Sequence, residues 1–229
     1  MTTAMTTIMT TTTTLRTLLT AAVVFFAACT PSPKVPDWKL ESKGSMDRAV
    51  TAYLEGDSRV ETAELARARL EISSTGRVDL MARAELLSCA SRTASLVFEP
   101  CAGFEKLRED APPAERAYAD YLAGKLSPQL INLLPKEQQI SALASVNRTL
   151  PAIENVADPL AKLVAAGTAL QAGLASPTLV QAAVDTASSQ GWRRPLLAWL
   201  GVQLKLAEAS GNAAEAARVQ RRIALTSGF

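Results

Sequence analysis

The side chains able to do chemistry are few, and the missing ones exclude whole classes of reaction. The 229 residues contain no histidine, which excludes Ser-His-Asp and Cys-His catalysis, histidine-ligated zinc and a histidine switch near neutral pH. The sequence also lacks a Gly-rich phosphate loop, a dinucleotide-binding fingerprint and a nucleophile elbow. We therefore expect a non-enzymatic protein with no cofactor and no metal. A net charge of +2 gives no reason to expect a nucleic-acid partner.

One acidic segment is the nearest approach to an acid–base site. Glu115 and Asp120 flank Tyr118 and Tyr121, and an acid between aromatic rings is typical of sugar-binding clefts. An α-helical lytic transglycosylase would need one catalytic glutamate there, but Glu115 is not part of the Glu-Ser segment of that family, because Arg116 follows it, and the Gly-Leu-Met-Gln segment is absent from the sequence. The simpler interpretation is that both tyrosines pack on the apolar face of a helix.

A cluster of tryptophan and arginine is the best candidate for recognition of a partner. Trp192, Arg193 and Arg194 precede Pro195, and Trp199 follows within two helical turns. Tryptophan and arginine are over-represented at the energetic centres of protein interfaces. The alternative is that the tryptophans fill the core of a helical hairpin while the arginines stay in solvent.

The N-terminal segment is typical of a secretory signal. An uncharged apolar run, TLLTAAVVFFAA at 17–28, follows Arg16. Twelve helical residues span about 18 Å, which is less than the ~30 Å of a bilayer core. A charge, a short apolar run and small residues at its end predict a signal peptide over residues 1–28.

The end of that signal resembles the lipobox of bacterial lipoproteins. The residues Phe26-Ala27-Ala28-Cys29 carry the resemblance, which implies cleavage before Cys29 and a lipid anchor on its side chain and new N-terminus. Three prolines between Thr30 and Asp37 predict an extended tether of roughly 25 Å over residues 29–37. The alternatives are an ordinary signal with a chance cysteine, or an uncleaved short anchor.

The residue that follows Cys29 bears on the membrane to which such a lipoprotein would be sent. Many enteric lipoproteins that stay in the inner membrane carry Asp there, whereas this chain has Thr30. The resemblance therefore implies an outer-membrane lipoprotein that faces the periplasm. The periplasmic face of the inner membrane is the second choice.

Two further cysteines remain, at positions 89 and 101. An even pair in an oxidising compartment is more often bridged than free. A helix running from residue 78 to Phe98 would keep Cys89 and Cys101 too far apart, whereas a chain reversal near Ser95 would bring them face to face. We predict a Cys89–Cys101 disulfide, with two small buried thiols as the alternative.

The remaining residues, 38–229, have helical spacing throughout, which predicts one all-α domain of about ten helices. Capping side chains before a proline mark three helix starts: Ser127-Pro128, Asp158-Pro159 and Ser176-Pro177. Glycines mark the expected helix ends: Gly56, Gly76, Gly124, Gly191 and Gly211.

The helix pairs are predicted to begin near residues 45, 78, 113, 159 and 193. Three of the four steps between these starts are close to the roughly 34 residues of a tetratricopeptide unit. Gly211-Asn212 followed by Ala216 is similar to the turn and small packing residue of that unit. We expect stacked α-hairpins forming a tetratricopeptide-like superhelix, with an irregular compact helical domain as the alternative.

These features together favour a cell-envelope lipoprotein that acts as a periplasm-facing scaffold or adaptor for an envelope protein partner. The alternatives are a helical lipoprotein that binds or cleaves peptidoglycan, or a periplasmic holdase chaperone. The expected site residues are Cys29 for the lipid, Cys89 and Cys101 for the disulfide, and Trp192, Arg193, Arg194 and Trp199 for the partner.

Overall fold

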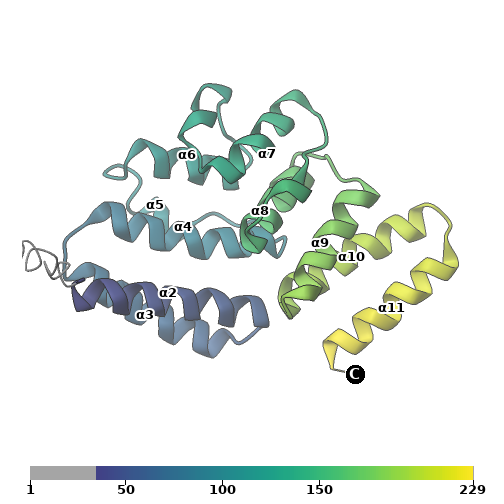
Figure 1. Cartoon of the computed structure of the whole chain (residues 1–229), viewed down its shortest axis with the longest axis horizontal. Coiled ribbons are helices and arrows are strands. Elements are labelled where there is room, and N and C mark those ends of the chain that lie inside the picture. The colour runs from purple at the N-terminus through teal and green to yellow at the C-terminus, as the bar shows by residue number, and fades with distance from the viewer. Residues whose placement is uncertain (1–34, 229) are drawn as a thin grey trace, which may run out of the picture. The chain divides into compact units, whose positions relative to one another are not determined.

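The computed structural model describes residues 35–228, and that part of the chain is all-α with no strand (Figure 1). Residues 37–229 form one compact unit. The predicted signal peptide at 1–28, Cys29 and the tether up to residue 34 lie outside the described residues. Within residues 35–228, none of the helices combines the length and the apolar character needed to cross a membrane.

The described residues form ten α-helices and two 3-10 helices. In chain order these are α2 (Asp37–Glu55), α3 (Ser58–Ser73), α4 (Val78–Ala94), α5 (Ala102–Glu105), α6 (Pro113–Leu122), η2 (Pro128–Leu133), α7 (Lys136–Asn147), η3 (Ile153–Asn155), α8 (Pro159–Gln171), α9 (Pro177–Ser189), α10 (Arg193–Ala209) and α11 (Ala213–Ser227).

The helix starts follow from the capping residues that the sequence supplies. Asp158 accepts a hydrogen bond from the Ala161 backbone N–H at 2.7 Å, and Ser176 accepts one from Leu179 at 3.1 Å. The predicted starts at 159 and 177 are confirmed, whereas Pro128 begins a 3-10 helix. Four of the five predicted pair starts, at 78, 113, 159 and 193, are confirmed.

The predicted start at residue 45 is wrong, because α2 already begins at Asp37. Pro36 cannot donate a backbone hydrogen bond, and an acidic residue in the first turn is favourable at the positive end of the helix dipole. The helix therefore begins directly after the proline-rich segment.

The glycines end the helices as expected. All five predicted stop positions, Gly56, Gly76, Gly124, Gly191 and Gly211, have positive φ. At Gly56 the φ angle is 95°, and the Asp57 N–H donates to the Ala52 carbonyl at 2.7 Å. This is the αL reversal that glycine adopts without a steric penalty.

Neighbouring helices pack in pairs, which confirms the helical hairpins. α2 packs on α3, and α8, α9 and α10 each pack on the next helix in the chain. Two further contacts join distant segments, because α4 packs on α8 and α2 packs on α10. In a one-dimensional repeat stack each unit contacts only its neighbours, so these two contacts are additional to simple stacking.

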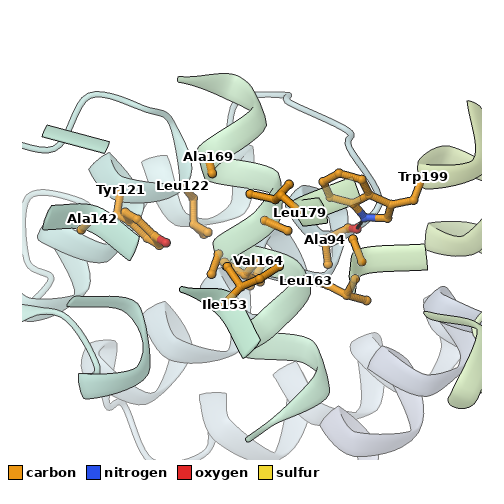
Figure 2. Close-up of a cluster of buried hydrophobic side chains, with 14 of the residues drawn as sticks. Ala94, Tyr121, Leu122, Ala142, Ile153, Leu163, Val164, Ala169, Leu179 and Trp199 are labelled. Atoms are coloured by element: carbon orange, nitrogen blue, oxygen red, sulfur yellow. Dashed lines mark hydrogen bonds between the residues drawn. The ribbon is translucent and has the colours of Figure 1, made fainter. Parts of the chain in front are cut away.

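The main core surrounds α8 (Figure 2). Leu163 and Val164 are buried there, and the Trp199 indole N–H donates to the Ala94 carbonyl at 3.0 Å. A Cβ atom on Gly167 would lie 2.5 Å from the carbonyl oxygen of Thr93. The glycine therefore allows α8 to approach the last turn of α4 closely.

The chain reversal after α4 creates the disulfide. α4 ends at Ala94, Leu96 adopts a positive φ of 60°, and the Val97 N–H donates back to the Arg92 carbonyl at 2.9 Å. Cys89 and Cys101 are bonded, with their Cα atoms 5.8 Å apart. The predicted reversal near Ser95 and the predicted disulfide are both confirmed.

Candidate partner-binding surface

The tryptophan–arginine cluster lies largely inside the molecule. Trp199 has 0% of its surface exposed, and Trp192 is partly buried against the main core. The interpretation that tryptophan fills the hairpin core is confirmed for Trp199, which has no surface available to a partner.

The two arginines attach α10 to the α2–α3 hairpin. The Arg194 guanidinium lies 4.1 Å from the Tyr53 ring centroid and donates to Ser58 Oγ at 2.9 Å. It also lies 3.7 Å from a carboxylate oxygen of Glu61. The Arg193 side chain lies over Gly56, with Nη2 3.0 Å from the point where a Cβ would stand. Arg193 is exposed, so it and Trp192 are the members of the cluster with surface left for a partner.

Tyr53 is the centre of this internal contact. Its ring lies between Arg194 and Arg92, the latter 4.8 Å from the centroid. Burial raises the pKa of the Tyr53 hydroxyl, and the positive charges of Arg92 and Arg194 partly oppose that shift. The cluster predicted as a surface therefore makes cation–π contacts within the chain.

Three buried glutamates are each held by an arginine from another helix. The pairs are Glu61 with Arg92 at 2.8 Å, Glu85 with Arg69 at 2.6 Å, and Glu115 with Arg83 at 2.6 Å. Gly103 is needed beside the second pair, because a Cβ there would overlap the Glu85 carboxylate. Buried carboxylates with such partners are typical of structural ion pairs that fix the relative position of helices.

The acidic segment around Glu115 does not form one site. Glu115 lies in a cleft of about 410 Å³ with Tyr118, whose pKa is raised by burial. Asp120 instead pairs with Arg108 at 3.0 Å and lines a different cleft. The two carboxylates are thus separated, and in the described part of the chain no set of three potential metal-ligating side chains converges.

Protein-family models, curated proteins and solved structures yield no match to this chain.

In residues 35–228, α7 carries more exposed large hydrophobic residues than any other helix. Ile140, Leu143 and Val146 are exposed by 55%, 52% and 42% on successive turns. Helical periodicity places them with two exposed polar residues, Lys136 and Asn147, on one side of the helix. We call these five residues the α7 outer face.

The opposite side of α7 is fixed in the core by polar contacts. The Tyr121 hydroxyl donates to Gln138 Oε1 at 2.7 Å and accepts from Thr168 Oγ1 at 2.8 Å. Ser141 Oγ donates to the Ala165 carbonyl at 3.2 Å. α7 is therefore anchored on α6 and α8, so its outer face is presented by an ordered helix.

A cleft of about 210 Å³ adjoins this face. Val146 lines it together with Ala142 and Ser145 of α7, and Leu126 and Ala172 contribute from neighbouring segments. Sequence reasoning missed this surface, because the spacing of Ile140, Leu143 and Val146 does not show whether the fold covers them. The apolar positions of α7 fall on more than one side of the helix, between polar residues, so they do not form one single stripe.

Proposed function

We propose that this protein is a lipid-anchored cell-envelope scaffold that binds a protein partner on the α7 outer face. The observation that carries the proposal is the exposure of Ile140, Leu143 and Val146 on an ordered helix. Exposed apolar patches that are contiguous over more than a few hundred Å² are uncommon on monomers and mark interaction sites, and we propose that these three side chains form the centre of one. The main partner surface that we propose is therefore the α7 outer face, and not the tryptophan–arginine cluster that the sequence favoured.

The cellular location proposed here is the outer membrane, with the domain facing the periplasm and anchored through Cys29. Its support is the lipobox-like sequence and the Cys89–Cys101 disulfide, because disulfides persist mainly in oxidising compartments. A tether of about eight residues would keep the domain near the membrane at a high effective concentration for other anchored proteins.

The fold proposed in finer detail is a degenerate tetratricopeptide-like array. Four helix pairs begin at 78, 113, 159 and 193, and two of the steps between them are close to one tetratricopeptide unit. Arrays of helical hairpins are used widely to present surfaces to other proteins, which is an argument from fold analogy.

The charge of the α7 outer face favours an acidic partner. Lys136 lies on the face, Arg148 follows at the end of the helix, and no carboxylate lies on the face. Glu137 is exposed too, but helical periodicity places it toward the buried Ser141 and Ala144, about 120° from Leu143 at the centre of the face. We propose that the occupant is an amphipathic segment with apolar residues flanked by Asp or Glu.

The cleft beside this face argues against a bilayer as the occupant. A flat lipid surface would leave the cleft beside Val146 unfilled, whereas a side chain of a protein partner can enter it.

The test is co-purification after membrane solubilisation, with variants matched for exposure. Leu143→Glu should abolish partner capture, because it removes apolar contact and repels an acidic segment, whereas Leu143→Lys should weaken capture less. Leu70→Glu is the control, since Leu70 is also exposed but lies on α3. Equal capture by the wild type and Leu143→Glu would contradict the proposed surface.

The anchor is tested separately. Palmitate labelling of the full chain should be lost in Cys29→Ser. Labelling that persists in this variant would contradict the anchor at Cys29 and leave the α7 test unaffected.

A further inference from the structure

The cleft beside Glu115 has the composition of a ligand site. Its apolar wall is formed by Leu86 and Leu87 of α4, Ala114 of α6, and Leu133, Leu134 and Pro135 before α7. The remaining lining residues are Tyr118, Glu115 and Arg83. A mostly apolar cleft of about 410 Å³ with a few polar groups matches the usual form of a small-ligand or side-chain pocket.

Only one of the two carboxylate oxygens of Glu115 in this cleft has a hydrogen-bond partner. Glu115 is 6% exposed, and its Oε1 accepts a hydrogen bond from Arg83 Nε at 2.6 Å. Its Oε2 is buried and has no hydrogen-bond partner within the described residues. Nearly all buried polar atoms in folded proteins are paired, so an orphaned carboxylate oxygen in a cleft wall indicates a missing donor.

Arg83 supplies the complementary group. Its side chain is 64% exposed, and within residues 35–228 its recorded hydrogen bond uses Nε, which leaves both Nη groups free to donate. The site thus presents an acceptor at Glu115 Oε2, donors at Arg83 Nη1 and Nη2, and an apolar wall.

We propose that this cleft binds one apolar residue of a peptide. The side chain of that residue lies against the leucines, its amide N–H donates to Glu115 Oε2, and its carbonyl oxygen accepts from Arg83. A peptide residue carries this combination of donor, acceptor and apolar group. The Glu115–Arg83 pair is neutral overall, which suits the uncharged amide. The site is independent of Cys29 and of the α7 outer face.

The test uses N-acetyl-leucine N,N-dimethylamide, whose single N–H is that of the residue, as the probe and the oxidised full-length chain as the protein. A ligand of this size is expected to bind with a dissociation constant of roughly millimolar order, which heteronuclear NMR titration measures. We expect saturable shifts at the cleft leucines and Tyr118. The matched depsipeptide, with an ester oxygen in place of the N–H, should bind at least about tenfold more weakly because it cannot donate to Oε2.

Two variants separate binding from folding. Ala114→Trp fills the cleft from an exposed position and should abolish the shifts, whereas Ala63→Trp, at an exposed position on α3, should leave them unchanged. Glu115→Gln should weaken binding about tenfold in a protein whose NMR dispersion shows that it is folded. Absence of saturable shifts in the wild type, equal binding of the depsipeptide, or binding that persists in Ala114→Trp would each overturn the proposal.

Discussion

Two consecutive helices, α7 and α8, both carry apolar residues on more than one side, but only α8 has most of these residues covered. α8 is packed by α4, α7 and α9, and its residues from Leu163 to Ala169 are all buried. α7 packs on α8 and η2 and keeps Ile140, Leu143 and Val146 in solvent. The comparison teaches that α7 carries apolar residues on a side that no other part of residues 35–228 covers. Under the function proposed above, a partner protein covers that side.

The largest expected effect tests whether the surroundings of α8 are a tightly packed core. Trp199→Ala should lower the free energy of unfolding by about 3–5 kcal/mol, because it leaves a large cavity and an unpaired Ala94 carbonyl. Chemical denaturation measures the change. Trp199→Phe keeps most of the volume and should cost less, and a loss below that of Trp192→Ala would contradict the core position of Trp199.

The second prediction concerns α4, on which α8 packs. Reduction of the Cys89–Cys101 bond should lower the free energy of unfolding by about 2–3 kcal/mol, as expected for a short closed loop of this sequence separation. Denaturation midpoints with and without reductant give the value. The double variant with serine at positions 89 and 101 should reproduce it, and an unchanged midpoint would show that the bond does not stabilise the α4 end.

The third prediction compares two helical glycines. Gly167→Ala should destabilise the protein by about 1–3 kcal/mol, because the new methyl group would meet the Thr93 carbonyl at 2.5 Å. Gly201→Ala, with nothing within 4 Å, should instead stabilise α10 by up to about 1 kcal/mol. Thermal unfolding of both variants measures whether the two changes in stability have opposite signs. Changes of the same sign would contradict the close approach of α8 to α4.

The fourth prediction concerns the hydroxyl that joins α7 to α8. Burial raises the pKa of Tyr121, so the folded chain keeps the proton at a pH where the unfolded chain, with an ordinary value of about 10, releases it. Stability is therefore fully present below pH 10 and falls as the pH rises above it. Tyr121→Phe should lose about 1 kcal/mol at neutral pH through the missing hydrogen bonds and should show a shallower alkaline decline. Denaturation of the wild type and the variant at a series of pH values measures the loss at neutral pH and the slope of the alkaline decline. The same decline in both proteins would contradict a contribution from the Tyr121 hydroxyl.

The smallest expected effect belongs to the α7 outer face. Leu143→Lys should change the free energy of unfolding by no more than about 0.5 kcal/mol, because the side chain is half exposed in the isolated chain. A loss of several kcal/mol on chemical denaturation would mean that this face is covered within the chain and would remove the basis of the comparison.

The sequence predicted those parts of the fold that local rules determine. Asp158 and Ser176 before prolines determine two helix starts, and Gly56 and Gly211 determine two ends, because each acts through its own backbone neighbourhood. The Cys89–Cys101 bond followed from the reversal near Ser95.

The site was harder to predict, because it depends on contacts between distant segments. Trp192 and Arg194 have the residue types of an interface, but Arg194 reaches Tyr53 and Glu61, which lie more than 130 positions earlier in the chain. Conversely, the apolar spacing of α7 is the same whether its outer face is covered or not. Periodicity shows that a helix needs neighbours, but it does not show which neighbours the chain provides.

The most direct test of the account is site-specific photo-crosslinking in intact cells, with one photoreactive residue placed at position 143, 193 or 70 of the full chain. The account predicts a discrete adduct with an acidic partner protein from position 143, and none from position 70 on α3. Adducts from position 193 without any from position 143 would contradict it, because they would return the partner surface to the tryptophan–arginine cluster.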